Sequence, residues 1–176
     1  MKHFALAAAL TALASPALAH VSLSATSAPA GSYFFGEFRI AHGCVGQDTI
    51  SIKVEIPDAI LVAKPQSKPG WGLEIESKPL DKPIQVDGRT VESRVASITW
   101  QGDLEDTEWD QLGLMAKLPS TPGVLAFPVT QTCAQGEVKW DEVPTAANPH
   151  PAHPAPTLTV TPAAGDDMAG MDMSGR

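Results

Sequence analysis

Apolar and polar residues alternate with a period of two along much of the chain. In the segment 49–57, TISIKVEIP, the apolar positions are Ile50, Ile52, Val54 and Ile56, and polar residues lie between them. The segment 32–41 repeats the pattern, with Glu37 and Arg39 opposite an apolar face formed by Phe34, Phe38 and Ile40. A period of two places alternate side chains on opposite faces of a β-strand. Both segments are therefore predicted to be half-buried strands.

Further strand-like segments are short, rich in apolar residues and separated by proline or glycine turns. They cover residues 71–77, 90–102, 109–119, 123–133, 136–144 and 156–162. The segment 90–102 follows an Asp87-Gly88 turn signal and is predicted to form a pair of strands. No stretch shows a helical period with caps. About eight such strands predict an all-β fold, a single antiparallel β-sandwich of immunoglobulin/fibronectin-III-like or cupredoxin-like type.

The first nineteen residues have the pattern of a secretory signal peptide. Lys2 precedes an apolar run over 4–13, and Pro16 is followed by Ala17-Leu18-Ala19, the small-x-small form that signal peptidase accepts. The run is too short for a stable transmembrane helix, and no later segment approaches the required length. We expect cleavage after Ala19 and a periplasmic or secreted protein. A retained N-terminal anchor is the alternative.

Length and charge restrict the nature of the chain after the signal peptide. Residues 20–162 are enough for one domain, and the segment 163–176 is small, polar and expected to be a disordered tail. The formal net charge is −8 and becomes more negative when Lys2 is removed. A nucleic-acid partner would require a basic face, so this class of partner is not expected.

Two cysteines, Cys44 and Cys133, occur in a chain predicted to reach an oxidising compartment. A disulfide is the usual state of such a pair. A copper–thiolate role is the alternative interpretation.

Cleavage after Ala19 would make His20 the first residue. Its α-amine, with a reference pKa of about 7.7–8.0, and its imidazole, near 6.5, could then chelate one metal ion through two nitrogens. Imidazole nitrogen suits Cu(II), zinc and nickel, and copper binds most tightly in the divalent series. The alternative is that a histidine follows the cleavage site by chance.

Other candidate ligands lie elsewhere in the chain. Met168, Met171 and Met173 fall in the predicted tail, where thioethers have no packing role and could bind Cu(I); compositional drift is the alternative. His42, in AHGC, is either a ligand facing the amino terminus or a histidine hydrogen-bonded in a turn. His150 and His153, in a proline-rich connector, are interpreted as surface histidines without a role.

Three tryptophans are assigned from their surroundings. Trp71 and Trp100 border apolar strands and are predicted to lie in the core. Trp140, in GEVKWDEVP, is either a core residue or an indole that contacts and shields a metal ion. The chain contains no Gly-rich phosphate loop, no G-x-S-x-G and no H-E-x-x-H, and we do not expect an enzyme.

Several motifs together resemble the YcnI-like family, whose members carry the DUF1775 domain and are exported copper-binding β-sandwiches. The motifs are AHVSL at the cleavage site, GSYFFGEFRIAHGC, VEIPD, KPGW, FPVTQTC, GEVKW with EVP, and PAPTLTVTP. The resemblance implies a Cu(II) site in which the terminal histidine is His20, a tryptophan, here Trp140, packs beside the metal, and a carboxylate adds an oxygen. Asp48 is one candidate for this carboxylate and Glu37 a weaker one, and His42 is a candidate to replace it.

These inferences lead to one preferred hypothesis and two alternatives. The preferred hypothesis is a periplasmic copper-binding protein, a chaperone or buffer that binds copper ions and exchanges them with other periplasmic or membrane copper-handling proteins. The first alternative is a histidine-brace copper oxidase or monooxygenase, with His42 as the second histidine. The second is a β-sandwich interaction module that binds no metal.

Overall fold

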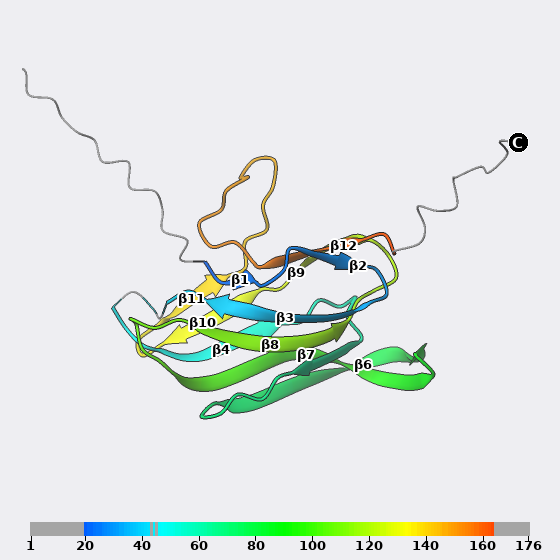
Figure 1. The fold of residues 1–176 in the computed structure, drawn as a ribbon, viewed down its shortest axis with the longest axis horizontal. Helices are drawn as coiled ribbons and strands as arrows, with labels where there is room; N and C mark the ends of the chain where they lie inside the picture. Colours follow the sequence, from blue (N-terminus) through cyan, green and yellow to red (C-terminus); the bar gives the residue numbers. More distant parts are fainter. Residues whose placement is uncertain (1–19, 43, 45, 164–176) are drawn as a thin grey trace, which may run out of the picture.

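The computed structural model describes residues 20–42, 44 and 46–163, and this part of the chain forms twelve β-strands (Figure 1). The strands are β1 (Ser22–Leu23), β2 (Ser27–Pro29), β3 (Tyr33–Ile40), β4 (Thr49–Glu55), β5 (Val62–Pro65), β6 (Gly72–Val86), β7 (Arg89–Leu104), β8 (Asp110–Lys117), β9 (Gly123–Ala126), β10 (Val129–Cys133), β11 (Glu137–Trp140) and β12 (Thr157–Thr161). None of the described residues lies in a helix long and apolar enough to cross a bilayer.

Two larger sheets enclose the core. One has the order β1-β3-β8-β5 and the other β11-β10-β4-β7-β6, and all neighbours within them are antiparallel. Their inner faces contribute to one hydrophobic cluster, whose fully buried members include Phe38, Leu112, Ile52, Ile98 and Trp100. The predicted all-β sandwich is confirmed.

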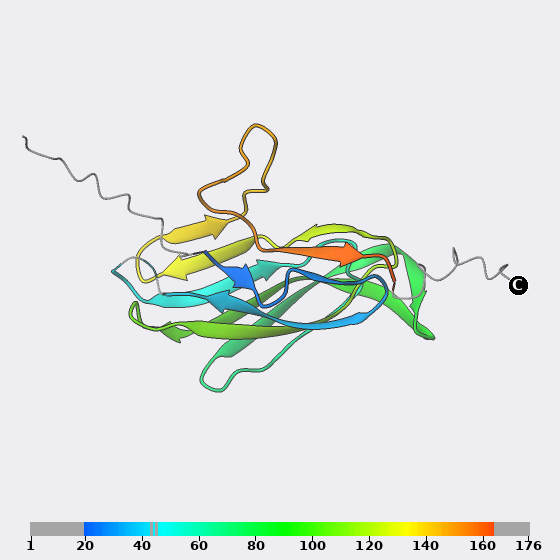
Figure 2. The same cartoon turned by 45° about the horizontal axis from the view of Figure 1, so that its top comes forward.

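A third sheet joins segments from the two ends of the described chain. Its order is β2-β12-β9; β12 pairs antiparallel with β9 but parallel with β2. The amide of Ala30 donates a hydrogen bond to the carbonyl of Thr161 (2.8 Å) beyond the last paired residues. Figure 2 shows β12 running beside the first strands. This sheet brings the segment that starts at His20 against residues 154–157, which precede and begin β12.

The alternation predicted for residues 49–57 is broken at its start. Ile50 is 45% exposed, whereas Thr49 is fully buried. The register of β4 against β7 shifts between Thr49 and Ser51, which is a β-bulge. The bulge turns Thr49 inward, where its hydroxyl accepts a hydrogen bond from Gln131 Nε2 (2.7 Å). The predicted burial of Ile50 was therefore wrong, and that of Ile52, Val54 and Ile56 was right.

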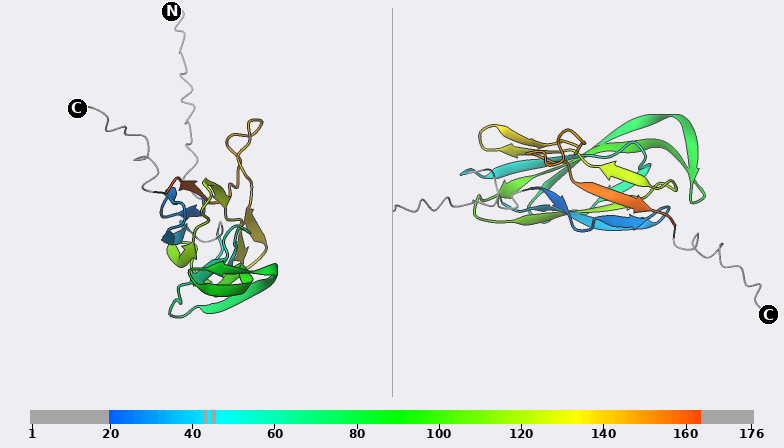
Figure 3. Two further views of the ribbon diagram at one scale, coloured as in Figure 1. Left: turned by 90° about the vertical axis from the view of Figure 1, so that its right-hand side faces the viewer. Right: turned by 90° about the horizontal axis from the view of Figure 1, so that it is seen from above.

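The segment 90–102 lies within a single strand, β7, instead of forming a pair. It pairs with β6 through a hairpin turn at Asp87-Gly88, where both residues have positive φ (48° and 77°). This conformation is the one that favours Asp-Gly in two-residue hairpins. Figure 3 shows the β6–β7 hairpin reaching past the end of the sandwich. The predicted segment 123–133 instead divides at Phe127–Pro128 into β9 and β10, which belong to different sheets.

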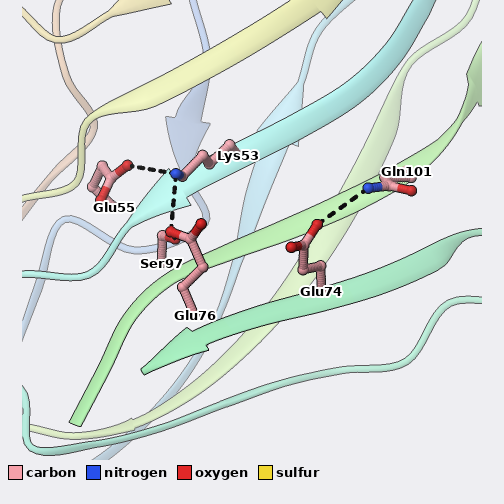
Figure 4. A network of polar contacts seen from close by, with 6 residues as sticks. All are labelled: Lys53, Glu55, Glu74, Glu76, Ser97 and Gln101. Atoms are coloured by element: carbon pink, nitrogen blue, oxygen red, sulfur yellow. Dashed lines mark hydrogen bonds and ion pairs between the residues drawn. The ribbon is translucent and has the colours of Figure 1, made fainter. Parts of the chain in front are cut away.

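A polar network on the outer face links three adjacent strands (Figure 4). Lys53 Nζ, on β4, lies 3.1 Å from Glu76 Oε2, on β6, and 3.4 Å from Glu55 Oε1. Between them, on β7, the Ser97 hydroxyl donates to Glu76 Oε2 (2.5 Å). The hydrogen bonds from Ser97 and Lys53 lower the pKa of Glu76, and the hydrogen bond to Glu76 raises the pKa of Lys53. The network therefore holds the edge strand β6 to the centre of the sheet.

Cys44 and Cys133 form a disulfide, with their Cα atoms 5.7 Å apart. The predicted pairing is confirmed. The bond ties the segment after β3 to the end of β10, and neither sulfur is available as a thiolate ligand in this state.

Candidate metal site around Trp140

Trp140 ends β11 and is only 6% exposed. Its Nε1 donates a hydrogen bond to Gln131 Oε1 (3.1 Å), and Gln131 itself is 2% exposed. The amide nitrogen of Gln131 donates to Thr49 Oγ1 (2.7 Å) and to the carbonyl of His42 (3.3 Å). These hydrogen bonds give the indole N–H and the side-chain amide of Gln131 their partners. The orientation of the indole is therefore fixed from inside the sandwich.

Two imidazole rings contact the indole of Trp140. The ring centroid of His20 lies 5.6 Å from that of Trp140 at an interplanar angle of 84°. The ring centroid of His153 lies 5.3 Å from that of Trp140 at 62°. Both are edge-to-face arrangements. Trp140 thus contacts Gln131 through its Nε1–H and two imidazoles through its ring.

His20 reaches this position because the chain after it is anchored. Val21 is buried at 3% exposure, and β1 pairs with β3 through Ser22↔Arg39 and Leu23↔Phe38. His20 itself is half-buried. Its side chain is therefore held at the edge of the first sheet, beside the strand that carries Trp140.

His153 reaches Trp140 through the connector between β11 and β12, which rises from the sandwich and returns (Figures 1 and 2). Glu142 holds the returning chain at three points. Its amide donates to the carbonyl of His153 (3.1 Å), its Oε2 accepts from the His153 amide (2.6 Å), and its carbonyl accepts from the Ala155 amide (2.9 Å). His153 is exposed, as the sequence predicted, but its contact with Trp140 was missed because no periodicity reports a pairing across this irregular connector.

A mostly apolar groove of about 610 Å³ begins at His20. Its lining includes Leu23, Arg39, Trp109, Pro154 and Pro156. Trp109 is 65% exposed, and none of the described residues forms an ion pair with Arg39. The groove therefore reaches the candidate site at His20.

The three candidates for a third ligand, His42, Asp48 and Glu37, differ in how they are connected to this site. The main chain at His42 is joined to Trp140 through Gln131. Asp48 Oδ1 instead accepts from the amide of Asp106 (3.2 Å), and Glu37 lines a separate groove beside Gln66. Within the described residues, neither carboxylate has a hydrogen bond or ion pair with His20, and no three His, Cys, Asp or Glu side chains cluster closely enough to hold a metal ion.

The structure describes two of the remaining predicted residues, Trp100 and Trp71, and not the others. Trp100 is fully buried, and Trp71 is half-buried and packs on the core against the backbone of Gly102, where a Cβ would meet the indole at 2.2 Å. The predicted signal and cleavage site and the tail methionines Met168, Met171 and Met173 lie outside the described residues.

Comparison with known proteins identifies the family of this domain. A family model described as "Domain of unknown function (DUF1775)" matches residues 20–160. The chain belongs to the DUF1775 family. A solved structure described as an uncharacterized protein from Nocardia farcinica with an immunoglobulin-like fold is similar to this DUF1775 domain, with 26% identity and a TM-score of 0.62. The match covers 82% of this chain and 99% of the Nocardia chain. A search of curated proteins found no significant match.

Proposed function

We propose that this DUF1775 protein is an exported copper-binding protein that carries or buffers copper, with Cu(II) held by His20 after cleavage behind Ala19. The observation that supports this most directly is the contact between the His20 imidazole and the Trp140 indole (5.6 Å between centroids). These are the two residues that the YcnI-like resemblance assigns to the terminal ligand and the neighbouring tryptophan. The signal-like segment before His20 supplies the expected cleavage.

The donors of His20 fit a cupric ion. Its α-amine and imidazole can both be unprotonated near neutral pH and form a chelate through two nitrogens. The Trp140 ring attracts a cation through its π-face and, because it is buried, limits access of water on that side. Copper would be cargo for exchange, so the site needs no reaction beyond replacement of ligands.

His42 is the proposed third protein residue, ahead of Asp48 and Glu37. Its main chain is bonded to the same glutamine that orients Trp140, whereas Asp48 already accepts a hydrogen bond from another loop. The tail thioethers of Met168, Met171 and Met173 would bind copper in its reduced, Cu(I), state. Other periplasmic or membrane copper-handling proteins are the expected partners in exchange.

The deciding experiment compares two forms of the protein, one beginning at His20 and one with a single glycine placed before it. The added residue moves the primary amine out of chelation range and leaves every side chain in place. We expect Cu(II) affinity to fall by more than about 100-fold, beyond the usual effect of losing an outer-shell partner. Competition titration measures the affinity, and N-terminal sequencing of the exported protein checks the cleavage. Equal affinities for the two forms would refute the proposal.

A further inference from the structure

We propose that His153 is a second imidazole donor at the His20 site, so that one copper ion is held by histidines from both ends of the domain. The inference rests on the proposed binding of copper at His20. It adds a residue for which neither the motifs nor the family match provides a role.

The first argument is that both imidazoles contact the same indole. The ring centroids of His20 and His153 lie 5.6 and 5.3 Å from that of Trp140, whose Nε1–H is bonded to Gln131. His153 is exposed and His20 half-buried, so neither imidazole is enclosed in the core. Two neutral imidazoles and a primary amine are nitrogen donors of the kind that Cu(II) favours.

The second argument is the way the main chain of His153 is held. Glu142 bonds the amide and the carbonyl of His153 and the amide of Ala155, so the backbone position of the histidine is fixed while its ring remains accessible. Pro151, Pro154 and Pro156 flank it and limit the freedom of the connector. Preorganisation of this kind lowers the entropic cost of binding an ion. The carboxylate of Glu142, next to the His153 backbone, also favours a cation nearby.

The third argument is the composition of the proposed set. Among the described residues no three His, Cys, Asp or Glu side chains form a metal cluster. The pair of His20 and His153 does not require one, because His20 contributes its amine as well as its ring, and in this arrangement His153 takes the ligand position proposed above for His42. The set therefore becomes complete only after cleavage exposes that amine.

The test uses the protein beginning at His20 and compares His153→Ala with a matched variant, His150→Ala. His150 is exposed on the same connector and has no ring contact with any described residue. We expect His153→Ala to weaken Cu(II) binding by about 10- to 100-fold and to remove one nitrogen coupling from the electron paramagnetic resonance spectrum. The His150→Ala variant should match the wild type in both measurements.

A measurement without substitutions guards against loss of folding in the variant. Substoichiometric Cu(II) should broaden the imidazole NMR signals of His20 and His153 before those of His150. Broadening of His20 alone, with unchanged affinity in His153→Ala, would overturn the role of His153 and leave the proposed function intact. Failure of the wild type to bind Cu(II) at all would overturn both.

Discussion

At the scale of single residues, Gln131 determines how Trp140 is presented. It accepts from the indole Nε1 and donates to Thr49 and His42, and it is 2% exposed. Removing a buried amide that satisfies several partners costs more stability than its own hydrogen bonds contribute. The reason is that those partners are left unpaired in a medium of low dielectric.

Replacement of Gln131 by leucine keeps the volume roughly similar and removes all these bonds. We expect the free energy of unfolding to fall by about 2–4 kcal/mol, because the indole N–H and the Thr49 hydroxyl each lose a buried partner. Urea denaturation followed by tryptophan fluorescence measures the change. Gln135→Leu, at an exposed position in the turn after β10, is the control and should be near neutral. Equal stabilities of the two variants would contradict the assigned role of Gln131.

At the scale of elements, the β4–β7–β6 network ties an edge strand to its sheet and makes part of the stability depend on pH. Hydrogen bonds from Ser97 and Lys53 lower the pKa of Glu76 from its ordinary value of 4.5. The ionised form is thus favoured in the folded state. The contribution of Glu76 to stability is complete above pH 4.5 and is lost as the pH falls through the lower folded-state pKa.

Glu76→Gln should therefore lose less stability on acidification than the wild type does. Denaturation at a series of pH values from neutral to below 4.5 measures this difference. Glu92→Gln on β7 is a matched control, since Glu92 is exposed and forms no ion pair within the described residues. Parallel acid profiles for wild type and Glu76→Gln would show that the network does not act through this carboxylate.

The elements also show where sequence patterns predict structure and where they do not. Alternation located β3 and the body of β4, because each has one face in the core. The bulge at Thr49 escaped prediction, since it depends on a hydrogen bond to Gln131, more than eighty positions away. β1, β2 and β5 are too short for a period to be visible. The start of β6 was predicted as 71–77, but its continuation to Val86 was not, because β6 lies at an exposed edge where apolar residues such as Leu73 and Ile75 remain half in solvent.

At the scale of the whole molecule, the site joins segments that the sequence keeps apart. His20 and Trp140 were found by their local motifs, and the fold brings their rings into contact. β1, which follows His20, belongs to one sheet, and β11, which Trp140 ends, belongs to the other. His153 could not be found in this way, because its place depends on the bonds that Glu142 makes across the connector. Sequence patterns therefore identified single candidates, and the fold determined which of them meet.

The disulfide acts on the molecule as a whole by closing a loop between residues 89 positions apart. Replacing both cysteines with serine should lower the free energy of unfolding by about 4–5 kcal/mol, mainly by releasing the unfolded chain. Urea denaturation of the double variant, compared with the oxidised wild type, measures the loss. The fully reduced wild type should match the double variant. An oxidised wild type no more stable than these two forms would contradict a structural role for the bond.

The parallel pairing of β2 with β12 has a consequence for the order in which the sheets form. Thr161 bonds back to Ala28, 133 positions earlier, so β2 cannot join its sheet until β12 is present. Truncation just before residue 157 would therefore leave the amino-terminal segment without its neighbour, however much of the sandwich had already formed.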